Sequence, residues 1–409
     1  MGRSPRVRIA LFYIMYNEEK IISRHLESLT SLVPLLEGIT VVTNGKDNTI
    51  PLMREWCNQQ RVPFVSHYHE FDDFGHQRYR SYQENIKAFP RATHDMTLDA
   101  DHCLVIDNRR QFIREIAAGG CLLLKECFRH SSTQSEGWNR RIFARSSPFE
   151  CWLRTHEIWI TLDRRCQYRR SYGAWIDDKS DGASHDVKYE RDVKLLLLDL
   201  AEINHLPAYK RDVYRQRVTF YLAQSYYSLH QFSSAAHYYQ LRTTQGGFEE
   251  EIYIAYWKGG VSHEQLARMY RNGLVDFDYG TTDELDRHHQ KGGITMAGLT
   301  YYDIYQKATF HTREAIRQYQ QATAYRPSRG EALYDLVRWY GTLYQPYDVL
   351  EGCHQGNALD KSDDNFLVNP LVYDYLFDIE LRTLRLHSND PVIRTIGDEA
   401  DRRLRDRGL

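Results

Sequence analysis

The sequence predicts an α/β domain with a mostly parallel, Rossmann-like sheet, followed by an all-α domain of helical repeats. Segments with the residue types of strands alternate with segments of helical spacing from residue 7 to about residue 101. The connections between them are short, and neighbouring parallel strands need a crossover of helical length. After about residue 205 the spacing is helical throughout, so we expect domains at residues 1–205 and 206–409.

The first domain contains four expected strands and three expected helices. Apolar, β-branched runs predict strands at residues 7–14, 39–42, 62–66 and 95–98. Apolar residues three and four apart predict a helix that begins near Ile21, and Pro51 fits the first turn of a helix that reaches about Gln60. A third helix is expected from about Gly75 to Phe89. This alternation is typical of a parallel sheet.

The second half has the spacing of helical hairpins. One set of small and aromatic residues matches a tetratricopeptide helix pair, in which small side chains let two helices approach and rings fill the space between them: Leu222, Ala223, Tyr226, Ala235 and Tyr239. A second set marks the end of one repeat and the start of the next: Ala315, Tyr319, Ala322, Pro327, Leu336, Val337 and Tyr340. Few residues between the two sets follow the pattern, so we expect a degenerate helical-repeat domain.

The composition argues against several classes of protein. Lys and Arg total 53 against 55 Asp and Glu, the formal net charge is -2, and no basic block is present, so we expect no nucleic-acid partner. The seven cysteines lack Cys-x-x-Cys spacing, which argues against a zinc knuckle or a disulfide framework. No apolar run approaches the roughly 18 to 20 residues that span a bilayer. We therefore expect a soluble protein of the cytoplasm.

Two carboxylates follow the last expected strand of the first domain. Asp99 and Asp101 stand two residues apart, directly after the strand at 95–98. Ligands of parallel sheets bind outside the carboxyl ends of the strands, where Asn17 and Asp47 are also expected. An isolated Asp-x-Asp pair is more often a solvated turn. The convergence of three polar strand ends favours a site for a divalent metal ion.

Further motifs extend over nearly the whole chain in a fixed order. In the first domain they are YNEE (residues 16–19), FDDFGHQR (71–78), LDAD (98–101), WLRTHEIW (152–159) and KYERD (188–192). In the second domain they are FYLAQSY (220–226), GGFEEE (246–251) and RPSRGEALY (326–334). Together they resemble the inverting GT-A glycosyltransferases of family 2, in the subgroup whose catalytic domain is followed by tetratricopeptide-like helices.

The resemblance implies a GT-A fold, a UDP- or GDP-sugar donor and a Mn²⁺ or Mg²⁺ cofactor. It implies that Asp101 binds the metal directly, that Asp99 contacts the ribose or a metal-bound water, and that His156 completes the metal shell or orients the diphosphate. His185 is a second candidate for a late metal ligand. The residues expected at the nucleotide sugar are Tyr16, Asn17, Glu18, Thr43, Asn44, Asp47, Arg78, Asp99, Lys188 and Arg191.

Two positions depart from the family pattern. The second strand of the family ends in Asp-x-Gly-Ser-x-Asp-x-Thr, whereas this chain has TNGKDNT (residues 43–49), which is one residue shorter and lacks the first aspartate. That carboxylate usually reads the edge of uracil, so the base of the donor stays open. The second departure is Arg154, which stands where the family usually has glycine.

Glu157 is the candidate general base that takes the acceptor proton in a single-displacement, inverting reaction. A carboxylate serves this purpose when partial burial raises its pKa, and Trp152 and Trp159 could supply such surroundings. In regular strand geometry His156 and Glu157 face opposite ways, so at most one of them points at the donor unless the chain bends there.

Each of these residues also has a structural explanation. Arg78 could be a surface arginine paired with Asp72 or Asp73. His156 could be a buried structural histidine, and Glu157 an ordinary interfacial glutamate. The polar stretch at residues 177–184 could be a lid that the diphosphate orders, or an exposed linker.

The function of the whole chain has alternatives too. An inactive GT-A domain could support helical repeats that bind a peptide or a protein. For a transferase, the acceptor could be a glycan, a peptide or a lipid-linked sugar, because helical repeats could position a peptide or form a homodimer interface.

Overall fold

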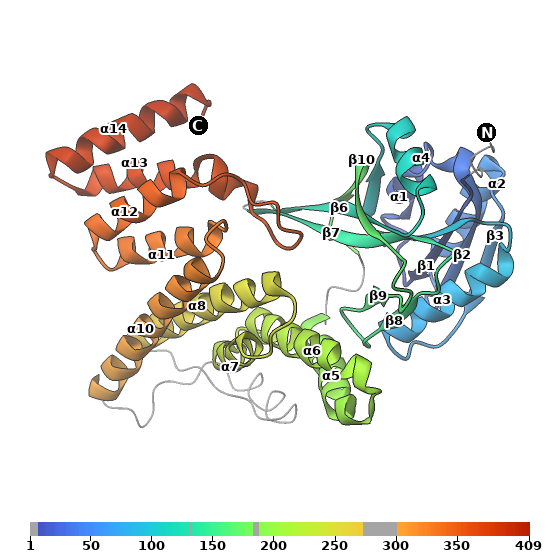
Figure 1. Ribbon diagram of the computed structural model, residues 1–409, viewed down its shortest axis with the longest axis horizontal. Helices are drawn as coiled ribbons and strands as arrows, with labels where there is room; N and C mark the ends of the chain where they lie inside the picture. The colour runs from blue at the N-terminus through green and yellow to red at the C-terminus, as the bar shows by residue number, and fades with distance from the viewer. Residues whose placement is uncertain (1–6, 131–132, 183–187, 273–300) are drawn as a thin grey trace. The chain divides into compact units, whose positions relative to one another are not determined.

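The chain forms two compact units, residues 1–191 and residues 192–409. The computed structural model describes residues 7–130, 133–182, 188–272 and 301–409 (Figure 1). The sequence places the domain boundary after residue 205, whereas the compact units divide inside helix α5 (Lys188–Glu202). The predicted fold class is confirmed, because an α/β unit is followed by a helical unit.

The first unit is built on an eight-stranded sheet with the order β3-β2-β1-β4-β7-β6-β10-β5. The pairings of β1 with β2 and β4, of β2 with β3 and of β6 with β10 are parallel, and the other three are antiparallel. A separate hairpin pairs β8 with β9. The strands are β1 (Ile9–Met15), β2 (Leu36–Thr43), β3 (Phe64–Tyr68), β4 (His94–Thr97), β5 (His102–Val105), β6 (Cys121–His130), β7 (Thr133–Ala144), β8 (Glu150–Trp152), β9 (Ile158–Ile160) and β10 (Tyr168–Asp178).

The four predicted strands correspond to β1 to β4, with ends that differ by three residues at most. They were recognisable because parallel strands covered on both faces are almost continuously apolar. In β1 the side chains from Ile9 to Tyr13 have no exposed surface. No strand is predicted after residue 98, so β5, β6, β7 and β10 extend the sheet beyond its predicted part, and β8 and β9 form a separate hairpin.

Helices cover both faces of the sheet (Figure 1). Helices α1 (Ile22–Ser28), α2 (Thr49–Gln60) and α4 (Arg109–Ala117) pack in one core with Leu11 and Tyr13. Helix α3 (Phe74–Ala88) contributes Tyr82 to a second core with Phe12 and Trp159. Because side chains alternate along a strand, neighbouring residues of β1 enter different cores. The polar motifs follow the carboxyl ends of β1, β2 and β4.

The second unit consists of helices. It contains part of α5, then η3 (Ile203–His205), α6 (Ala208–Ser228), α7 (Phe232–Thr243), α8 (Glu249–Arg271), α10 (Tyr301–Tyr325), α11 (Glu331–Thr342), α12 (Pro346–Asn357), η4 (Val372–Leu376), α13 (Phe377–His387) and α14 (Pro391–Asp406). The predicted helix pair at residues 222–239 is the hairpin α6–α7, where Ala235 and Tyr239 are buried. Helices are confirmed here, and their tetratricopeptide type stays a prediction.

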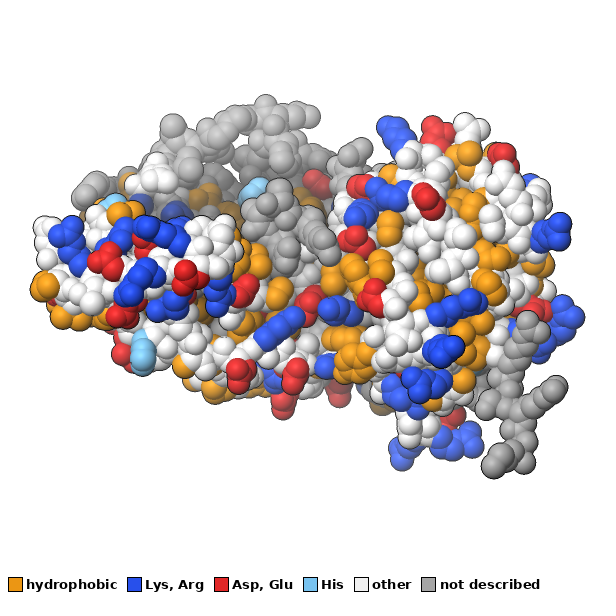
Figure 2. Space-filling model, turned by 90° about the horizontal axis from the view of Figure 1, so that it is seen from above, with side chains coloured by type: hydrophobic (Ala, Val, Ile, Leu, Met, Phe, Trp, Pro, Cys, Tyr) orange, Lys and Arg blue, Asp and Glu red, His pale blue; other side chains and the backbone are white. Residues whose placement is uncertain are grey.

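The surface carries charges of both signs. On the face shown in Figure 2, Lys and Arg side chains are interspersed with Asp and Glu, in keeping with the formal net charge of -2. Among the residues that the structure describes, every helix is too short or too polar to cross a membrane.

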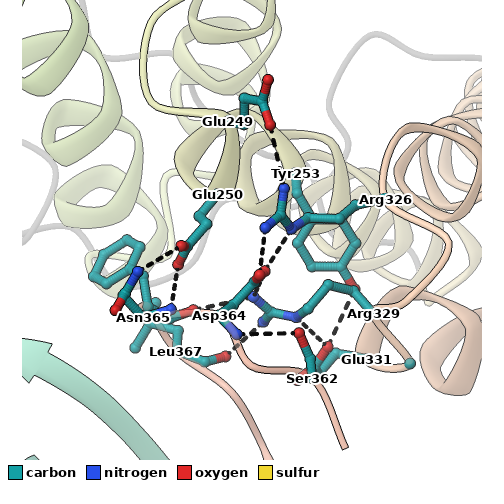
Figure 3. A network of polar contacts seen from close by, with 12 residues as sticks. Glu249, Glu250, Tyr253, Arg326, Arg329, Glu331, Ser362, Asp364, Asn365 and Leu367 are labelled. Carbon is teal, nitrogen blue, oxygen red and sulfur yellow. Dashed lines mark hydrogen bonds and ion pairs between the residues drawn. The ribbon is translucent and has the colours of Figure 1, made fainter. Parts of the chain in front are cut away.

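A buried network of charges joins three segments of the second unit (Figure 3). Arg329, in the turn between α10 and α11, has no exposed surface and donates to Glu331 at 2.8 Å, to Asp364 at 3.0 Å and to the carbonyl of Leu367 at 2.8 Å. Arg326 donates to the same Asp364 at 2.6 Å. A buried guanidinium is tolerated only when its donors are satisfied, so this network fixes the loop before η4.

The start of α8 holds the same loop. Glu250 accepts hydrogen bonds from the backbone N–H of Asn365 at 2.7 Å and from its side-chain amide at 3.1 Å. The hydroxyl of Tyr253 donates to Glu331 at 3.3 Å and accepts from the backbone N–H of Ala332 at 3.0 Å. The motifs GGFEEE and RPSRGEALY therefore meet in a single network (Figure 3).

Replacing Arg329 by methionine should destabilise the protein by about 3–5 kcal/mol, because the change leaves Glu331 without its buried cation and removes one of the two arginines that bind Asp364. The free energy of unfolding, measured by denaturant titration of the full chain, tests this. Arg215→Met is the matched control, since Arg215 pairs with Asp212 on the surface at 3.2 Å and should cost at most about 1 kcal/mol. Equal losses in the two variants would contradict a structural role for the network.

Candidate functional site

The turns after β1 and β2 lie next to each other at the carboxyl edge of the sheet, because their strands pair in parallel. Hydrogen bonds connect the two turns directly. The amide oxygen of Asn17 accepts from the backbone N–H of Lys46 at 3.0 Å, and Asp47 accepts from that of Glu19 at 2.9 Å. The hydroxyl of Thr49 accepts from the backbone N–H of Glu18 at 2.7 Å. The polar motif residues thus form one connected platform.

This platform leaves little room at its centre. Asn17 has a positive φ of 56°, and a Cβ atom on Gly45 would lie 2.9 Å from the backbone nitrogen of Asn17. The hydroxyl of Thr43 donates to the carbonyl of Met15 at 2.9 Å. Tyr16 is 47% exposed beside these residues. Thr43, Asn17 and Asp47 therefore have structural partners of their own, and their contacts with a nucleotide stay a prediction.

Arg78 lies at the centre of the charged part of the site. It projects from the first turns of α3, whose N-terminus is capped by Asp73, which accepts from the backbone N–H of His76 at 2.7 Å. Its Nη2 contacts Asp99 at 2.6 Å and its Nε contacts Glu157. The alternative pairing with Asp72 or Asp73 does not form.

One donor of Arg78 has no acceptor. Its Nη1 is buried and lacks a hydrogen-bond partner among the residues that the structure describes. A buried donor without a partner is unfavourable, and it is satisfied when an oxygen-rich ligand binds there. The guanidinium is therefore held by two carboxylates with one edge still available to a third acceptor.

Asp99 connects Arg78 to further charged groups. Its second oxygen contacts Arg141 of β7 at 3.4 Å and His102 at 3.6 Å. Burial opposes ionisation of Asp99, but the positive charge of Arg78, with further contributions from the facing His102 and Arg141, outweighs it and holds its pKa well below the usual range. Asp99 is thus a permanent carboxylate whose oxygens contact protein cations.

Asp101, His102 and Asp178 form a group that could hold a metal ion, and we call it the Asp-His-Asp group. Their ligand atoms all lie within 4.8 Å of one another. His102 begins β5 and Asp178 ends β10, and the antiparallel pairing of these strands sets the two residues opposite each other. The Nδ1 of His102 accepts from the backbone N–H of Asp99 at 3.1 Å, which turns its Nε2 towards Asp178 at 3.6 Å.

The electrostatics of the Asp-His-Asp group favour a divalent cation. Burial raises the pKa of Asp101, and the nearby carboxylates of Asp99 and Asp178 raise it further against the effect of His102. Burial lowers the pKa of His102, but the net shift is upward because Asp99 and Asp178 face it. Bound cations would relieve the repulsion between the carboxylates. Carboxylates with water suit Mn²⁺ or Mg²⁺, and the imidazole of His102 would join them through Nε2 only with its proton moved to Nδ1, which ends the hydrogen bond from Asp99.

A buried histidine, His25, holds the backbone at His102 in place. The Nδ1 of His25, in α1, lies 2.6 Å from the carbonyl oxygen of His102, and its Nε2 lies 2.8 Å from the hydroxyl of Tyr13. Burial lowers the pKa of His25 to about 4, so the ring is neutral at pH 7. The neutral ring donates from Nδ1 to the carbonyl and accepts from the tyrosine.

The segment after β10 closes over the Asp-His-Asp group. Ser180 donates to Asp178 from its backbone N–H at 2.7 Å and from its hydroxyl at 3.0 Å. Asp181 forms a two-pronged ion pair with Arg24 of α1, at 2.7 and 2.9 Å. A Cβ atom on Gly182 would lie 3.4 Å from a carboxylate oxygen of Asp101. The start of the polar stretch at residues 177–184 is thus held close to the proposed metal ligands.

His156 and Glu157 lie in the loop between β8 and β9. The chain bends there, because Leu153 and His156 have positive φ values of 74° and 51°. The bend removes the strand geometry that would turn the two side chains to opposite sides. Glu157 contacts Arg78, and His156 is not part of the Asp-His-Asp group. A role of His156 as a metal ligand stays a prediction.

Three further predicted residues lie after β10. The guanidinium of Arg191 stacks over the ring of Phe74 at 4.6 Å, near the start of α3. The ammonium group of Lys188 lies 5.8 Å from the ring of Tyr189. His185 lies outside the described residues.

The structure adds four residues that the sequence did not single out: Glu126, Arg141, His102 and Asp178. Glu126 is buried in β6, contacts Asn139, and binds the Nε of Arg141 at 2.5 Å. His102 had a local signal, because it directly follows the Asp-x-Asp pair. The other three come from strands that the sequence did not predict.

Comparisons with known proteins give limited similarity. A crystal structure of S. aureus TarS is 13% identical with a TM-score of 0.33, and the match covers 65% of this chain and 54% of TarS, so the chain matches about half of that protein's length. A structure of TarS 1–349 is 13% identical with a TM-score of 0.32 and coverages of 64% and 85%. TarS 1–349 in complex with UDP is 12% identical, with a TM-score of 0.31 and coverages of 72% and 100%. No protein-family model and no curated protein matches the chain. The mostly parallel sheet followed by helices fits a GT-A domain followed by a helical region.

The lowered pKa of His25 predicts that the stability of the protein depends on pH. Its pKa is about 4 in the folded chain, against the ordinary value of 6.5, so the unfolded chain binds an extra proton between these values. The contribution of His25 is complete above pH 6.5 and is lost as the pH falls towards 4, by up to about 3 kcal/mol. Denaturant unfolding of the wild type and of His25→Gln between pH 7 and pH 4 should show a steeper fall for the wild type. Parallel pH profiles would contradict a buried neutral His25.

Proposed function

We propose that the protein is a metal-dependent, inverting glycosyltransferase of the family 2 type that takes its sugar from a UDP- or GDP-sugar. The observation that carries this proposal is the adjacency of two features on one sheet edge. The Asp-His-Asp group suits a divalent cation, and the buried Nη1 of Arg78 lacks an acceptor among the described residues. Asp99 contacts both Arg78 and His102. A nucleoside diphosphate offers oxygen atoms to both features.

The proposed roles follow from the charge that develops on the diphosphate as the sugar leaves. A Mn²⁺ or Mg²⁺ ion held by Asp101 would neutralise part of this charge. His102 and Asp178 are the further ligands that the structure supports, and His156 is the ligand that the family resemblance suggests. Arg78 would donate from Nη1 to a phosphate oxygen, which suits its planar array of donors. Asp99 would hold Arg78 and His102 in place and contact the ribose or a metal-bound water.

Glu157 is the proposed base. During single displacement it would accept the acceptor's proton while the acceptor oxygen or sulfur attacks the sugar from the face opposite the diphosphate. Its side chain is 14% exposed, so it is shielded but reachable. The residues proposed to contact the nucleoside or its diphosphate are Tyr16, Asn17, Glu18, Thr43, Asn44, Asp47, Lys188 and Arg191.

We propose that the second unit binds and positions the acceptor. Its helix pair α6–α7 has the small and aromatic residues of a tetratricopeptide pair, and such repeats commonly bind peptides or proteins. The acceptor is therefore proposed to be a peptide, a glycan or a lipid-linked sugar. The same helices could form a homodimer, and the proposed location is the cytoplasm.

Asp101→Ala should reduce the metal-stimulated hydrolysis of the donor about 100-fold or more, because the diphosphate loses its charge partner. The assay measures the release of UDP or GDP from a panel of UDP- and GDP-sugars with and without Mn²⁺. Asp212→Ala is the control, since Asp212 is a surface aspartate of α6 that is 80% exposed.

Two results together would contradict the proposed enzymatic function. One is the absence of hydrolysis with every donor, and the other is an unchanged melting temperature when UDP or GDP is added with Mn²⁺. They would favour the non-catalytic scaffold instead.

Asp178→Asn should weaken the binding of Mn²⁺ about 10- to 100-fold, because it removes a charged member of the Asp-His-Asp group. Titration calorimetry of the full chain with Mn²⁺ in the presence of UDP measures the change. Asp177→Asn is the matched control on the neighbouring residue, whose carboxylate pairs with Lys179 at 2.6 Å. Equal affinities of the wild type and Asp178→Asn would remove Asp178 from the metal site.

A further inference from the structure

A set of aromatic and basic side chains lies on one face of strands β7 and β10. Trp138 and Arg140 stand two residues apart in β7, and Tyr168 and Arg170 stand two residues apart in β10. In the register of the sheet, Arg140 and Arg170 both pair with Leu123 of β6, the strand between them. Directly paired residues and residues two apart share a face of a sheet, so the four side chains lie on the same side.

Rings and guanidinium groups stack on each other within this set. The guanidinium of Arg140 lies over the ring of Tyr168 at 4.6 Å, and that of Arg170 lies over the ring of Trp138 at 5.2 Å. The rings of Trp138 and Tyr172 meet edge to face, with their centres 5.7 Å apart. Tyr168 is 42% exposed and Tyr172 is 67% exposed. We call these five residues the aromatic-arginine face.

A β-bulge holds Tyr172 on the surface. The register of β10 is irregular around this residue. The carboxylate of Glu115, in α4, accepts hydrogen bonds from the hydroxyl of Ser171 at 2.6 Å and from the backbone N–H of Tyr172 at 3.0 Å. It also accepts one from the backbone N–H of Gly173 at 3.3 Å, and a Cβ atom there would lie 2.5 Å from the backbone nitrogen of Phe112. Bulges often redirect a side chain beside a functional site, and this one is fixed by its packing against α4.

The aromatic-arginine face adjoins the loop that carries the proposed base. The Nη1 of Arg140 donates to the carbonyl oxygen of Trp159 at 2.6 Å. Trp159 follows Glu157 by two residues, which span at most about 7 Å. The next residue of β7, Arg141, contacts Asp99 at 3.4 Å. The face is therefore continuous with the proposed site.

We propose that the aromatic-arginine face binds the sugar rings of an anionic glycan, and that this glycan is the acceptor of the transferase proposed above, on which the assignment depends. Sugar rings have apolar faces of C–H groups that stack on aromatic rings, and oxygen atoms at their edges that accept from guanidinium groups.

The charge of the face favours an anionic glycan. Lys125 pairs with Trp138 in the sheet and adds a third cation to Arg140 and Arg170. The carboxylate of Glu136 lies 3.5 Å from the ammonium group of Lys125. Three cations and one anion leave a net positive charge, which attracts carboxylate, phosphate or sulfate groups on a glycan.

The same observations disfavour a lipid or a peptide on this face. An acyl chain requires a continuous apolar surface, and the guanidinium groups interrupt the rings. Peptides commonly bind by adding a strand to a sheet edge, whereas the face lies across β6, which is paired on both sides.

Binding of the full chain to an array of neutral and anionic oligosaccharides tests this assignment, followed by calorimetry with the strongest oligosaccharide. The wild type should bind anionic members of the array. Tyr172→Ala should weaken that binding about 10-fold or more, because it removes the exposed ring, and Arg170→Gln should weaken it similarly. Tyr172→Phe keeps the ring and should bind as the wild type does. Tyr344→Ala is the control, since Tyr344 is a 93% exposed tyrosine of the helical unit.

Equal affinities of the wild type, Tyr172→Ala and Arg170→Gln would overturn the glycan site. Preferential binding to neutral oligosaccharides, to peptides or to vesicles of anionic lipid would overturn it too. A wild type that hydrolyses a sugar nucleotide but binds no oligosaccharide of the array would remove the glycan site and leave the proposed function standing. A wild type that binds anionic glycans through this face but hydrolyses no sugar nucleotide would instead contradict the proposed transferase and the role of the glycan as its acceptor.

Discussion

The carboxyl edge of the sheet depends on the pairing of buried charges. Arg78 joins Asp99, at the end of β4, to Glu157, in the loop between β8 and β9, and Arg141 joins Asp99 to Glu126. Charges that are removed from water are tolerated only when they are matched by partners of opposite sign. Several carboxylates lie at this edge and require cationic partners. Two of these partners are Arg78 and Arg141. The Asp-His-Asp group is the part of the edge where we propose that a cation from solution completes the pairing.

The sequence predicted the parts of this arrangement that depend on local pattern. The strands β1 to β4, the helices α2 and α3, and the strand-end positions of Asp99 and Asp101 follow from apolar periodicity. The pairing of Asp178 with His102 depends on the antiparallel register of β10 and β5, and β10 has an irregular register between Arg170 and Trp175. The register depends on packing across the sheet, so it cannot be predicted from the composition of one strand. For this reason the second half of the site could not be predicted.

The motifs of the helical unit are a different case. The sequence identified residues that turn out to be structurally important, but it did not indicate what they do. Glu250, Arg326 and Arg329 belong to segments singled out by family resemblance. The structure satisfies each of them internally, through Asp364, Asn365 and Glu331. A charged residue in such a motif can thus serve packing, because a fully paired network fixes the loop before η4. Arg78 differs from the arginines of this network, because its Nη1 is unpaired among the described residues.

The two turns of the platform after β1 and β2 have a consequence for engineering. Asn17 and Asp47 each bind the backbone of the other turn, and Gly45 has no room for a side chain beside Asn17. The conformation of each turn therefore depends on the other. A chimera that imports the longer, aspartate-containing turn of a relative would also have to import that relative's first loop. Evolutionary changes in these turns would be inherited as matched pairs of loops and not as single substitutions.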